Sequence, residues 1–268
     1  NLAVAGALIA QAAARGARLA VLPENFALMA RSDAERLAAR ERPGAGPIQD
    51  FLADAALRHG LVLVGGTAPL AGDDPRRVRA ACLVHGPDGA LLARYDKLHL
   101  FDVDVPATGD RPAARYRESA GFEPGTQVVV AATPVGRIGL AVCYDLRFPE
   151  LFRALADGGA EIMVLPSAFT EDTGRAHWHV LVRARAIENL CAVIAPGQAG
   201  THATGRRTYG HSLIVNAWGE VRSELAHTDP GVACADLDLD AQAATRARFP
   251  ALTHRRLRPA GAAAAGRV

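Results

Sequence analysis

Short apolar runs bounded by glycine and proline alternate along this chain with segments whose apolar residues recur every three to four positions. The run LVLVGG is typical of a buried strand, because a strand covered on both faces has no polar alternation. Residues 47–59 instead show helical spacing through Ile48, Leu52 and Ala56. Helices are predicted in the same way over residues 2–15, 151–158 and 175–189. Helices that alternate with strands predict an α/β fold.

A turn signal between two apolar runs indicates that some strands are antiparallel. The sequence Pro-Asp-Gly at 87–89 separates CLVH from ALLARY, which predicts a β-hairpin. A single doubly wound sheet is the alternative architecture for such a pattern. The hairpin weighs against it, because an all-parallel sheet has no use for so tight a turn.

The chain contains an internal repeat. Three pairs of segments match in order and residue type: 18–27 with 161–170, 61–69 with 191–200, and 81–95 with 211–225. The offset is 143 positions at Pro23 and Pro166 and 130 positions at Gly89 and Gly219. A duplicated unit of this size is one supersecondary block that buries its sheet against its twin. We therefore predict two sheets that face each other.

Composition excludes several classes of protein. No stretch approaches the roughly 20 apolar residues of a membrane span, and a net charge of +2 with interspersed signs gives no reason to expect nucleic acid as a partner. The four cysteines form no CxxC pair, so a structural zinc site is not expected. Free thiols indicate a cytoplasmic protein. We expect one domain over residues 1–255 and a tail at 256–268 that is flexible or lies at an interface.

The chain has a single lysine. Of its 30 Lys and Arg residues, all but Lys97 are arginine. Arginine is a permanently charged planar fork, whereas lysine is a compact charge whose pKa shifts readily on burial. Lys97 is therefore a candidate for a role that needs a small ammonium group.

Three reactive side chains lie at or just past predicted strand ends. Glu24 follows LAVLP, Lys97 follows ALLARYD, and Cys143 follows GRIGLAV directly before a helix that opens at Pro149. A cysteine in such a strand–turn–helix elbow is exposed at the sheet edge, and the helix N-terminus favours its thiolate. A loop glutamate and a buried structural cysteine are the alternatives for Glu24 and Cys143. The other cysteines lie in apolar runs and are expected to be buried: Cys82, Cys191 and Cys234.

If these three strand ends meet, they predict nucleophilic catalysis. Glu24 would take the thiol proton, Cys143 would attack a carbon centre, and Lys97 would lie near the thiolate and the developing oxyanion. Two other classes stay open at this point. The first is a binding protein without activity, and the second is a redox sensor that uses Cys143 with a resolving thiol.

A metal site is the further alternative. His177 and His179 lie near Glu171 and Asp172. Residues two apart point to opposite faces of a strand and to diverging faces of a helix, which is poor geometry for two ligands of one ion. We therefore expect no metal and no cofactor, and we expect residues 169–178 to form one wall of the pocket.

The blocks LPENF, YDKLHLFD and GLAVCYDLRFPELFR resemble the three signature blocks of the nitrilase, or carbon–nitrogen hydrolase, superfamily. The resemblance extends from residue 1 to about residue 250. It implies a four-layer αββα sandwich with a pseudo-twofold repeat, and it implies Glu24, Lys97 and Cys143 as a catalytic triad. It also implies that Glu118 in YRES orients the lysine and that the backbone N–H of Tyr144 contributes to the oxyanion hole.

Other segments are similar to the branch of this superfamily that hydrolyses small ω-amides. PSAFT and AHWHVLVRARAIE look more like deaminated-glutathione amidases than ω-amidases of 2-oxoglutaramate. The resemblance implies hydrolysis of a carbon–nitrogen bond through a cysteinyl thioester, with release of ammonia. N-carbamoyl amino acid hydrolysis is a further alternative. Candidate substrate-binding residues are Arg147, Phe169, Thr170 and His177, and candidate carboxylate-binding arginines are Arg175, Arg183, Arg206 and Arg207.

The resemblance also carries expectations about the edge of the sheet and about assembly. Members of the family begin with a β-strand before the helix that opens this chain, so the sheet is expected to lack its first strand. They associate through outer helices, which implies a homodimer or higher oligomer. A small amide and water are the other expected partners. The basic segment at 246–259 is either a solvated tail or an arm that crosses to a partner.

Overall fold

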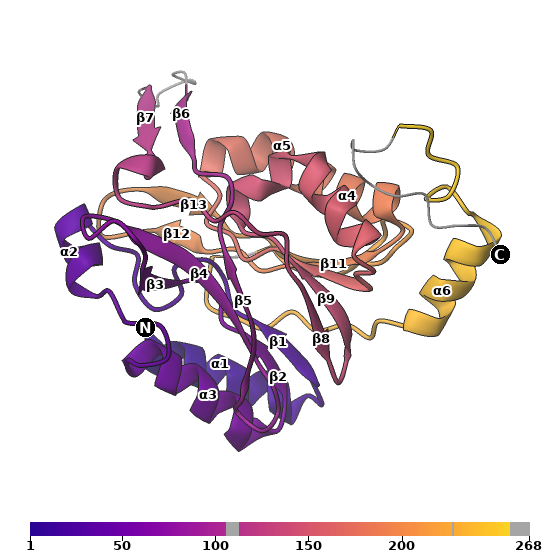
Figure 1. Cartoon of the computed structure of the whole chain (residues 1–268), viewed down its shortest axis with the longest axis horizontal. Helices are drawn as coiled ribbons and strands as arrows, with labels where there is room; N and C mark the ends of the chain where they lie inside the picture. Colours follow the sequence, from indigo (N-terminus) through magenta and orange to yellow (C-terminus); the bar gives the residue numbers. More distant parts are fainter. Residues whose placement is uncertain (106–112, 227, 258–268) are drawn as a thin grey trace.

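The computed structural model describes residues 1–105, 113–226 and 228–257. Two β-sheets pack face to face, and a layer of helices covers the outer face of each (Figure 1). The first sheet contains β1 (Leu19–Val21), β2 (Val62–Val64), β3 (Ala68–Ala71), β4 (Val78–His85) and β5 (Leu91–Asp96). The second contains β8 (Val130–Thr133), β9 (Gly136–Leu140), β10 (Ile162–Val164), β11 (Ala192–Ala195), β14 (Ser212–Val215) and β15 (Val221–Leu225). The predicted αββα sandwich is confirmed.

The outer layers are pairs of helices. Helices α1 (Leu2–Ala14) and α3 (Pro47–His59) cover the first sheet, and α4 (Pro149–Asp157) and α5 (Glu171–Asn189) cover the second (Figure 1). Helix α5 begins four residues before its predicted start. The smaller elements are α2 (Asp33–Ala38), β6 (Asp102–Val105), β7 (Ala114–Arg117), β12 (Ala199–Thr201), β13 (Arg207–Tyr209) and α6 (Leu239–Arg248), with short 3₁₀ turns at Glu118–Ala120 and Cys143–Arg147.

Strand pairing confirms the internal repeat. In the first half β1 pairs with β2 in parallel, and β2, β4 and β5 follow as antiparallel neighbours. In the second half β10, β11, β14 and β15 repeat this order and these directions. The halves differ in two places, because β10 has β9 on its other side and β4 also pairs with β3. Within the described residues β1 pairs only with β2.

The continuous apolar run before Gly65 is explained by burial on both faces of the first sheet. Val62 and Val64 pack into the core between the sheets, whereas Leu61 and Leu63 pack against α1 and α3. The same alternation holds in β4, where Cys82 lies in the inter-sheet core. Both outward-facing and inward-facing residues are therefore apolar.

One glycine allows the ends of β1 and β2 to approach each other. Gly66 has a φ of +55°, and a side chain there would collide with the carbonyl oxygen of Pro23. A residue without Cβ is needed because the backbone conformation is left-handed and the neighbouring chain is in contact. This approach fixes the position of Glu24, the residue that follows Pro23.

The C-terminal region departs from one expectation. Cys82 and Cys191 are buried as predicted, but Cys234 is exposed. The prediction for Cys234 was wrong because residues 231–238 run extended without forming a strand, so the apolar run is not enclosed in a sheet. In the basic segment, Arg255 pairs with Asp157 at the end of α4, with 2.9 Å between Nη2 and Oδ2. Of the expected tail at 256–268, residues 258–268 lie outside the described residues.

Within the described residues, no helix is both long enough and apolar enough to cross a bilayer.

Candidate functional site

The three reactive strand ends meet in one cavity. Glu24, Lys97 and Cys143 line a space of about 660 Å³ together with Glu118 and Tyr144. Glu24 and Lys97 come from the first half of the chain, just past β1 and β5, and Cys143 comes from the turn between β9 and α4. The fold therefore brings together the three side chains that the sequence singles out.

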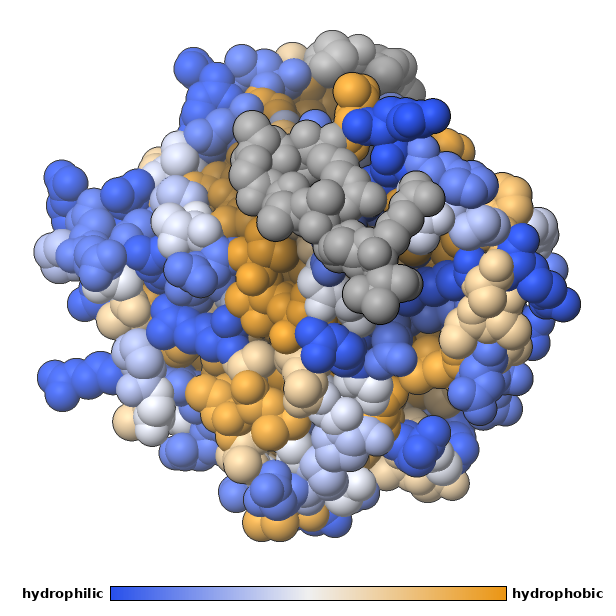
Figure 2. Space-filling view, turned by 45° about the vertical axis from the view of Figure 1, so that its right-hand side comes forward, coloured by the Kyte–Doolittle hydropathy of each residue, from blue (hydrophilic) through white to orange (hydrophobic). Residues whose placement is uncertain are grey.

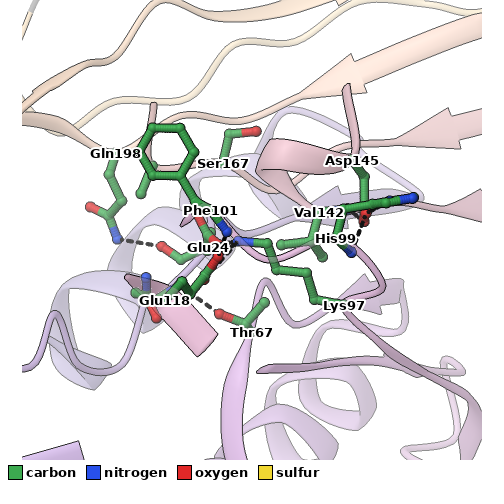
Figure 3. Close-up of polar contacts among 12 residues, drawn as sticks. Glu24, Thr67, Lys97, His99, Phe101, Glu118, Val142, Asp145, Ser167 and Gln198 are labelled. Carbon is green, nitrogen blue, oxygen red and sulfur yellow. Dashed lines mark hydrogen bonds and ion pairs between the residues drawn. The ribbon is translucent and has the colours of Figure 1, made fainter. Parts of the chain in front are cut away.

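Lys97 is held between two carboxylates. Its Nζ donates to Glu24 Oε1 at 2.8 Å and to both oxygens of Glu118, at 2.8 and 2.9 Å (Figure 3). Its side chain is only 2% exposed. Glu118 is itself fixed, because its Oε2 also accepts a hydrogen bond from the backbone N–H of Phe101 at 2.6 Å.

Two opposing effects act on the pKa of Lys97. Burial lowers this pKa, but the charges of Glu118 and Glu24 outweigh burial and raise it well above its usual value. Lys97 is therefore an ammonium ion at neutral pH and holds its proton tightly.

Cys143 has a constrained backbone. Its φ is +49°, a left-handed value that is uncommon for residues other than glycine, and its N–H donates to the carbonyl oxygen of Pro166 at 2.9 Å. This turn directs Cys143 into the cavity at the end of β9, as the strand–turn–helix pattern predicts. Strain of this kind is typical of functional sites.

The resting state of Cys143 differs from the expectation. Burial raises the pKa of its thiol, and the neighbouring charge of Glu24 raises it further, while Lys97 opposes the shift only in part. Helix α4 begins at Pro149 as expected, but burial and Glu24 outweigh any stabilisation of a thiolate by its N-terminus. The resting group is thus a thiol that is hydrogen-bonded to Glu24.

Asp145 connects the segment after β5, which contains Lys97, to the turn that contains Cys143 (the cysteine turn). Its Oδ2 accepts a hydrogen bond from the Tyr95 hydroxyl at 2.6 Å. Its Oδ2 also accepts from the Val142 N–H at 2.8 Å, and its Oδ1 accepts from the His99 N–H at 3.1 Å (Figure 3). Its side chain is fully buried. Sequence reasoning missed this role, although a carboxylate two residues after the cysteine in a buried turn was a usable signal.

The backbone around Glu24 is also fixed from two sides. Thr67 accepts a hydrogen bond from the N–H of Asn25 at 2.8 Å, and Gln198 donates to the carbonyl oxygen of Glu24 at 3.1 Å (Figure 3). Thr67 belongs to the first half of the chain and Gln198 to the second. Glu24 is therefore positioned by the contact between the two halves.

The remaining predicted site residues fall into two groups. Phe169 and Thr170 line the cavity, as expected for a wall formed by residues 169–178. Arg147 and His177 are not among the described residues that line it, and they lie against each other, with 3.4 Å between Arg147 Nη1 and His177 Nδ1. A contact of Arg147 or His177 with substrate stays a prediction.

The cavity wall is rich in guanidinium groups: Arg31, Arg36, Arg115, Arg117 and Arg206. The first four pair with carboxylates of the same chain, namely Glu35, Asp33 and Asp104. Arg206 differs from them. Its Nη2 donates to the carbonyl oxygen of Ala168 at 2.7 Å, and its Nε is buried with no hydrogen-bond partner among the described residues.

The other arginines considered from the sequence point elsewhere. Arg175 and Arg207 pair with Glu171, and Arg183 donates to the carbonyl oxygen of Gly219. Among the four candidates in the described part of the chain, only Arg206 reaches the cavity. An unpaired buried donor on a residue of the cavity wall can bind an anionic group of a ligand.

The metal alternative that rests on His177 and His179 is geometrically unfavourable. The two histidines are on one helix but face different partners, since His177 lies at Arg147 and His179 Nε2 lies 2.9 Å from Glu224 Oε1. The divergence expected for residues two apart is therefore observed.

Comparison with known proteins places this chain in a family. A family model described as carbon–nitrogen hydrolase matches residues 1–247. The chain belongs to the carbon–nitrogen hydrolase family.

Individual relatives are consistent with this assignment. A deaminated glutathione amidase of Yersinia enterocolitica is 45% identical over 207 residues, which cover 77% of this chain and 71% of that protein. Saccharomyces cerevisiae Nit3, of branch 10 of the nitrilase superfamily, is similar in structure with a TM-score of 0.83 and 29% identity, over 96% of this chain and 90% of that one.

A solved amidase offers a chemical parallel. The amidase of Nesterenkonia sp. AN1, as its E41Q mutant, is 27% identical with a TM-score of 0.71, over 93% of this chain and 91% of that one. Its structure shows acrylamide joined by Michael addition to the active-site cysteine. The family and the relatives together make this chain an amidase that hydrolyses carbon–nitrogen bonds.

Proposed function

We propose that this chain hydrolyses the amide of a small carboxylate-bearing substrate of the deaminated-glutathione type, with Glu24, Lys97 and Cys143 as its catalytic residues. The observation that carries the proposal is the convergence of these three buried side chains in a cavity whose wall contains Arg206, the Nε of which has no hydrogen-bond partner among the described residues. The similarity to curated deaminated glutathione amidases supports this choice of substrate class.

The first half-reaction follows from the contact between thiol and carboxylate. Glu24 takes the proton of the Cys143 thiol as the sulfur forms a bond to the carbonyl carbon. Because the resting thiol has a raised pKa, deprotonation occurs together with attack and not beforehand. The electron pair of the carbonyl bond moves to oxygen, and the Lys97 ammonium and the Tyr144 backbone N–H stabilise this oxyanion.

Collapse of this adduct breaks the carbon–nitrogen bond. Glu24 returns the proton to the leaving nitrogen, and the acyl group stays on Cys143 as a thioester. In the second half-reaction Glu24 takes a proton from water, whose oxygen attacks the thioester carbon. The carboxylic acid product leaves, and the sulfur regains a proton to restore the thiol.

The environment of Lys97 supports a role as a fixed charge and not as a proton donor. Glu118 and Glu24 raise its pKa well above the usual value, so proton donation from Lys97 would be costly. Glu24 alone then carries the proton in both half-reactions, and Glu118 keeps the ammonium group in place.

The nature of the leaving group distinguishes the candidate substrates. Both amides of glutathione are substituted on nitrogen, so hydrolysis of its deaminated form releases an amine and not the ammonia that the resemblance implied. A primary ω-amide such as 2-oxoglutaramate releases ammonia. The partnerless Nε of Arg206 in the cavity wall favours a substrate that bears a carboxylate.

The direct test compares these two substrates on the purified full-length chain. We expect faster hydrolysis, measured as kcat/KM, with deaminated glutathione than with 2-oxoglutaramate, and no product from Cys143→Ala with either. A preference for 2-oxoglutaramate would identify the chain as an ω-amidase. No hydrolysis of either, or of an N-carbamoyl amino acid, would refute the proposal.

A second test concerns Arg206. We expect Arg206→Met to raise KM for a carboxylate-bearing substrate by about 10- to 100-fold, since hydrogen bonds to charged groups contribute about 1.5–3 kcal/mol. The matched control is Arg175→Met, because Arg175 pairs with Glu171 at the surface and is absent from the described cavity wall. Equal KM values for the two variants would exclude Arg206 as the carboxylate anchor.

We further propose that the chain forms a homodimer or higher oligomer in a reducing compartment such as the cytoplasm. Ile187, Trp218 and Phe249 are large apolar residues that are about half exposed, and the rings of Trp218 and Phe249 are 5.9 Å apart. Apolar residues also gather between charged ones on the face shown in Figure 2. The four free thiols are consistent with a reducing compartment. Light scattering of the wild type and of Trp218→Asp measures the oligomeric state, and a monomeric wild type would contradict the proposal.

A further inference from the structure

We propose that His179, His211 and Glu224 form a binding site for a divalent transition-metal ion such as Zn²⁺, separate from the catalytic cavity. Each residue offers one ligand atom, and the three atoms lie within 4.8 Å of one another. None of them is among the described residues that line the cavity around Cys143. This inference does not depend on the substrate proposed above.

The three ligand atoms converge on a single point. His179 Nε2 lies 2.9 Å from Glu224 Oε1, and His211 Nδ1 lies 2.6 Å from the same oxygen. Bonds of about 2.0–2.2 Å to a tetrahedral ion would place neighbouring ligand atoms about 3.3 Å apart. To admit an ion, the two nitrogens need to move away from Glu224 Oε1 by about 0.4–0.7 Å, and their own separation, which is within 4.8 Å, needs to become about 3.3 Å.

Three different elements supply these ligands, which makes the site a link between them. His179 belongs to α5, His211 follows β13 and precedes β14, and Glu224 belongs to β15. Side chains of the three residues are between one quarter and one third exposed, so an ion can enter from solvent without local unfolding. The remaining coordination positions would be filled by water.

The orientation of His211 is set by its neighbours. Its φ is +51°, and its carbonyl oxygen accepts a hydrogen bond from Trp178 Nε1 at 2.8 Å. The ring of Tyr209 stacks on the His211 ring at 4.1 Å between centroids and meets the His179 ring edge-on at 6.0 Å. Both imidazoles are thus held by packing before an ion binds, which lowers the entropic cost of assembling the site.

The donor set selects the class of ion. Two imidazole nitrogens and one carboxylate oxygen suit Zn²⁺, Co²⁺ and Ni²⁺, whereas Mg²⁺ and Ca²⁺ prefer oxygen ligands throughout. Without an ion the same residues can form a hydrogen-bonded cluster in which Glu224 accepts from both rings. The two states differ in a measurable way, since only one of them takes up metal.

The position of the site suggests a stabilising role. Trp178, which donates to His211, packs on Phe169 with 5.0 Å between ring centroids, and Phe169 lines the catalytic cavity. An ion at this site would tie α5 to β15 and to the segment that enters β14, behind the wall of the cavity. We expect it to raise the thermal stability of the fold without taking part in the reaction.

The experiment is a titration of chelator-treated, full-length protein with Zn²⁺ against a chromophoric competitor. We expect one ion per chain at this site, and we expect His179→Ala, His211→Ala and Glu224→Gln each to weaken its binding by about tenfold or more. Saturating Zn²⁺ should raise the melting temperature of the wild type by about 5 °C and leave that of the triple variant unchanged.

Two controls separate this site from other metal ligands. His254→Ala removes an exposed histidine elsewhere, and Cys234→Ala removes an exposed thiol that can bind zinc by itself. Both should keep the ion that the His179 and His211 variants lose. Uptake that is absent, or that is the same in the wild type and the triple variant, would show a hydrogen-bonded cluster only and overturn the proposal.

Discussion

The two halves of this molecule have the same strand order, but equivalent strand ends differ in chemistry. After β1 the chain reads Leu-Pro-Glu, and Glu24 contacts Lys97. After β10 it reads Leu-Pro-Ser, and Ser167 at the matching position donates a hydrogen bond back to the carbonyl oxygen of Leu165 at 3.0 Å. Both residues are buried. One strand end supplies a functional group, and its counterpart only completes local structure.

The two halves therefore provide a common scaffold, and the reactive side chains lie where the halves contact each other. This contact between the halves is called the seam below. The first half contributes the carboxylates and the ammonium group, while the second contributes the thiol from the turn after β9. Asp145 and Gln198 of the second half bond across the seam to residues of the first. Neither half alone contains the complete constellation.

The largest effect should come from substitutions at the two matching positions, residues 24 and 167. We expect Glu24→Gln to lower kcat by up to about 10⁴-fold, the upper end of the range for general acid–base catalysis. Ser167→Ala should lower stability by about 1 kcal/mol through one lost hydrogen bond and leave kcat within about tenfold. Amide hydrolysis and thermal unfolding of both variants measure these effects, and comparable losses of kcat would remove the functional distinction between the halves.

The second effect concerns the single lysine. We expect Lys97→Arg to lower kcat by about 10²–10³-fold, because a planar guanidinium cannot occupy the compact position between Glu24, Glu118 and the oxyanion. Circular dichroism checks that the variant is folded. If a folded Lys97→Arg keeps near wild-type turnover, a compact ammonium group is not required.

A third effect tests the link across the seam. Asp145→Asn replaces an acceptor of several buried hydrogen bonds. We therefore expect the free energy of unfolding to fall by about 1–3 kcal/mol. We also expect kcat to fall by up to about 10²-fold, because the cysteine turn would be misplaced. Tyr95→Phe, which removes one of these donors, is the milder matched variant. If Asp145→Asn loses stability but no activity, the link is structural only.

The last effect concerns the two buried thiols outside the catalytic cavity, one in each half. Burial raises the pKa of Cys82 and of Cys191 to about 12 from 9.0. Above pH 9 the unfolded chain loses these protons while the native chain keeps them, so stability falls as pH rises from 9 toward 12. The limiting slope is about 1.4 kcal/mol per pH unit for each thiol.

Denaturant unfolding at several alkaline pH values measures this slope. Cys82→Ala and Cys191→Ala should each flatten it, and the exposed Cys234→Ala should not. Equal slopes in the wild type and in the two buried variants would contradict the assignment.

Much of the frame was predictable from local pattern. Apolar residues spaced four positions apart predicted the helix that contains Ile48, and apolar runs bounded by glycine or proline predicted β2 and β11. The matched segments of the repeat predicted the shared strand order. Family resemblance added Glu118, which contacts Lys97 as expected. The prediction for Cys234 failed because an apolar run is only a strand when a neighbouring strand pairs with it, and pairing is a non-local property.

The sequence by itself determined which residues end the strands and therefore that Glu24, Lys97 and Cys143 are candidates. It could do so because strand formation and turn chemistry depend on neighbours along the chain. Only the tertiary structure decided that Arg206 and not Arg175 reaches the cavity, that Asp145 joins two loops, and that His179 meets His211 and Glu224. These facts depend on which surfaces of distant segments pack together, and spacing along the chain carries no record of that packing.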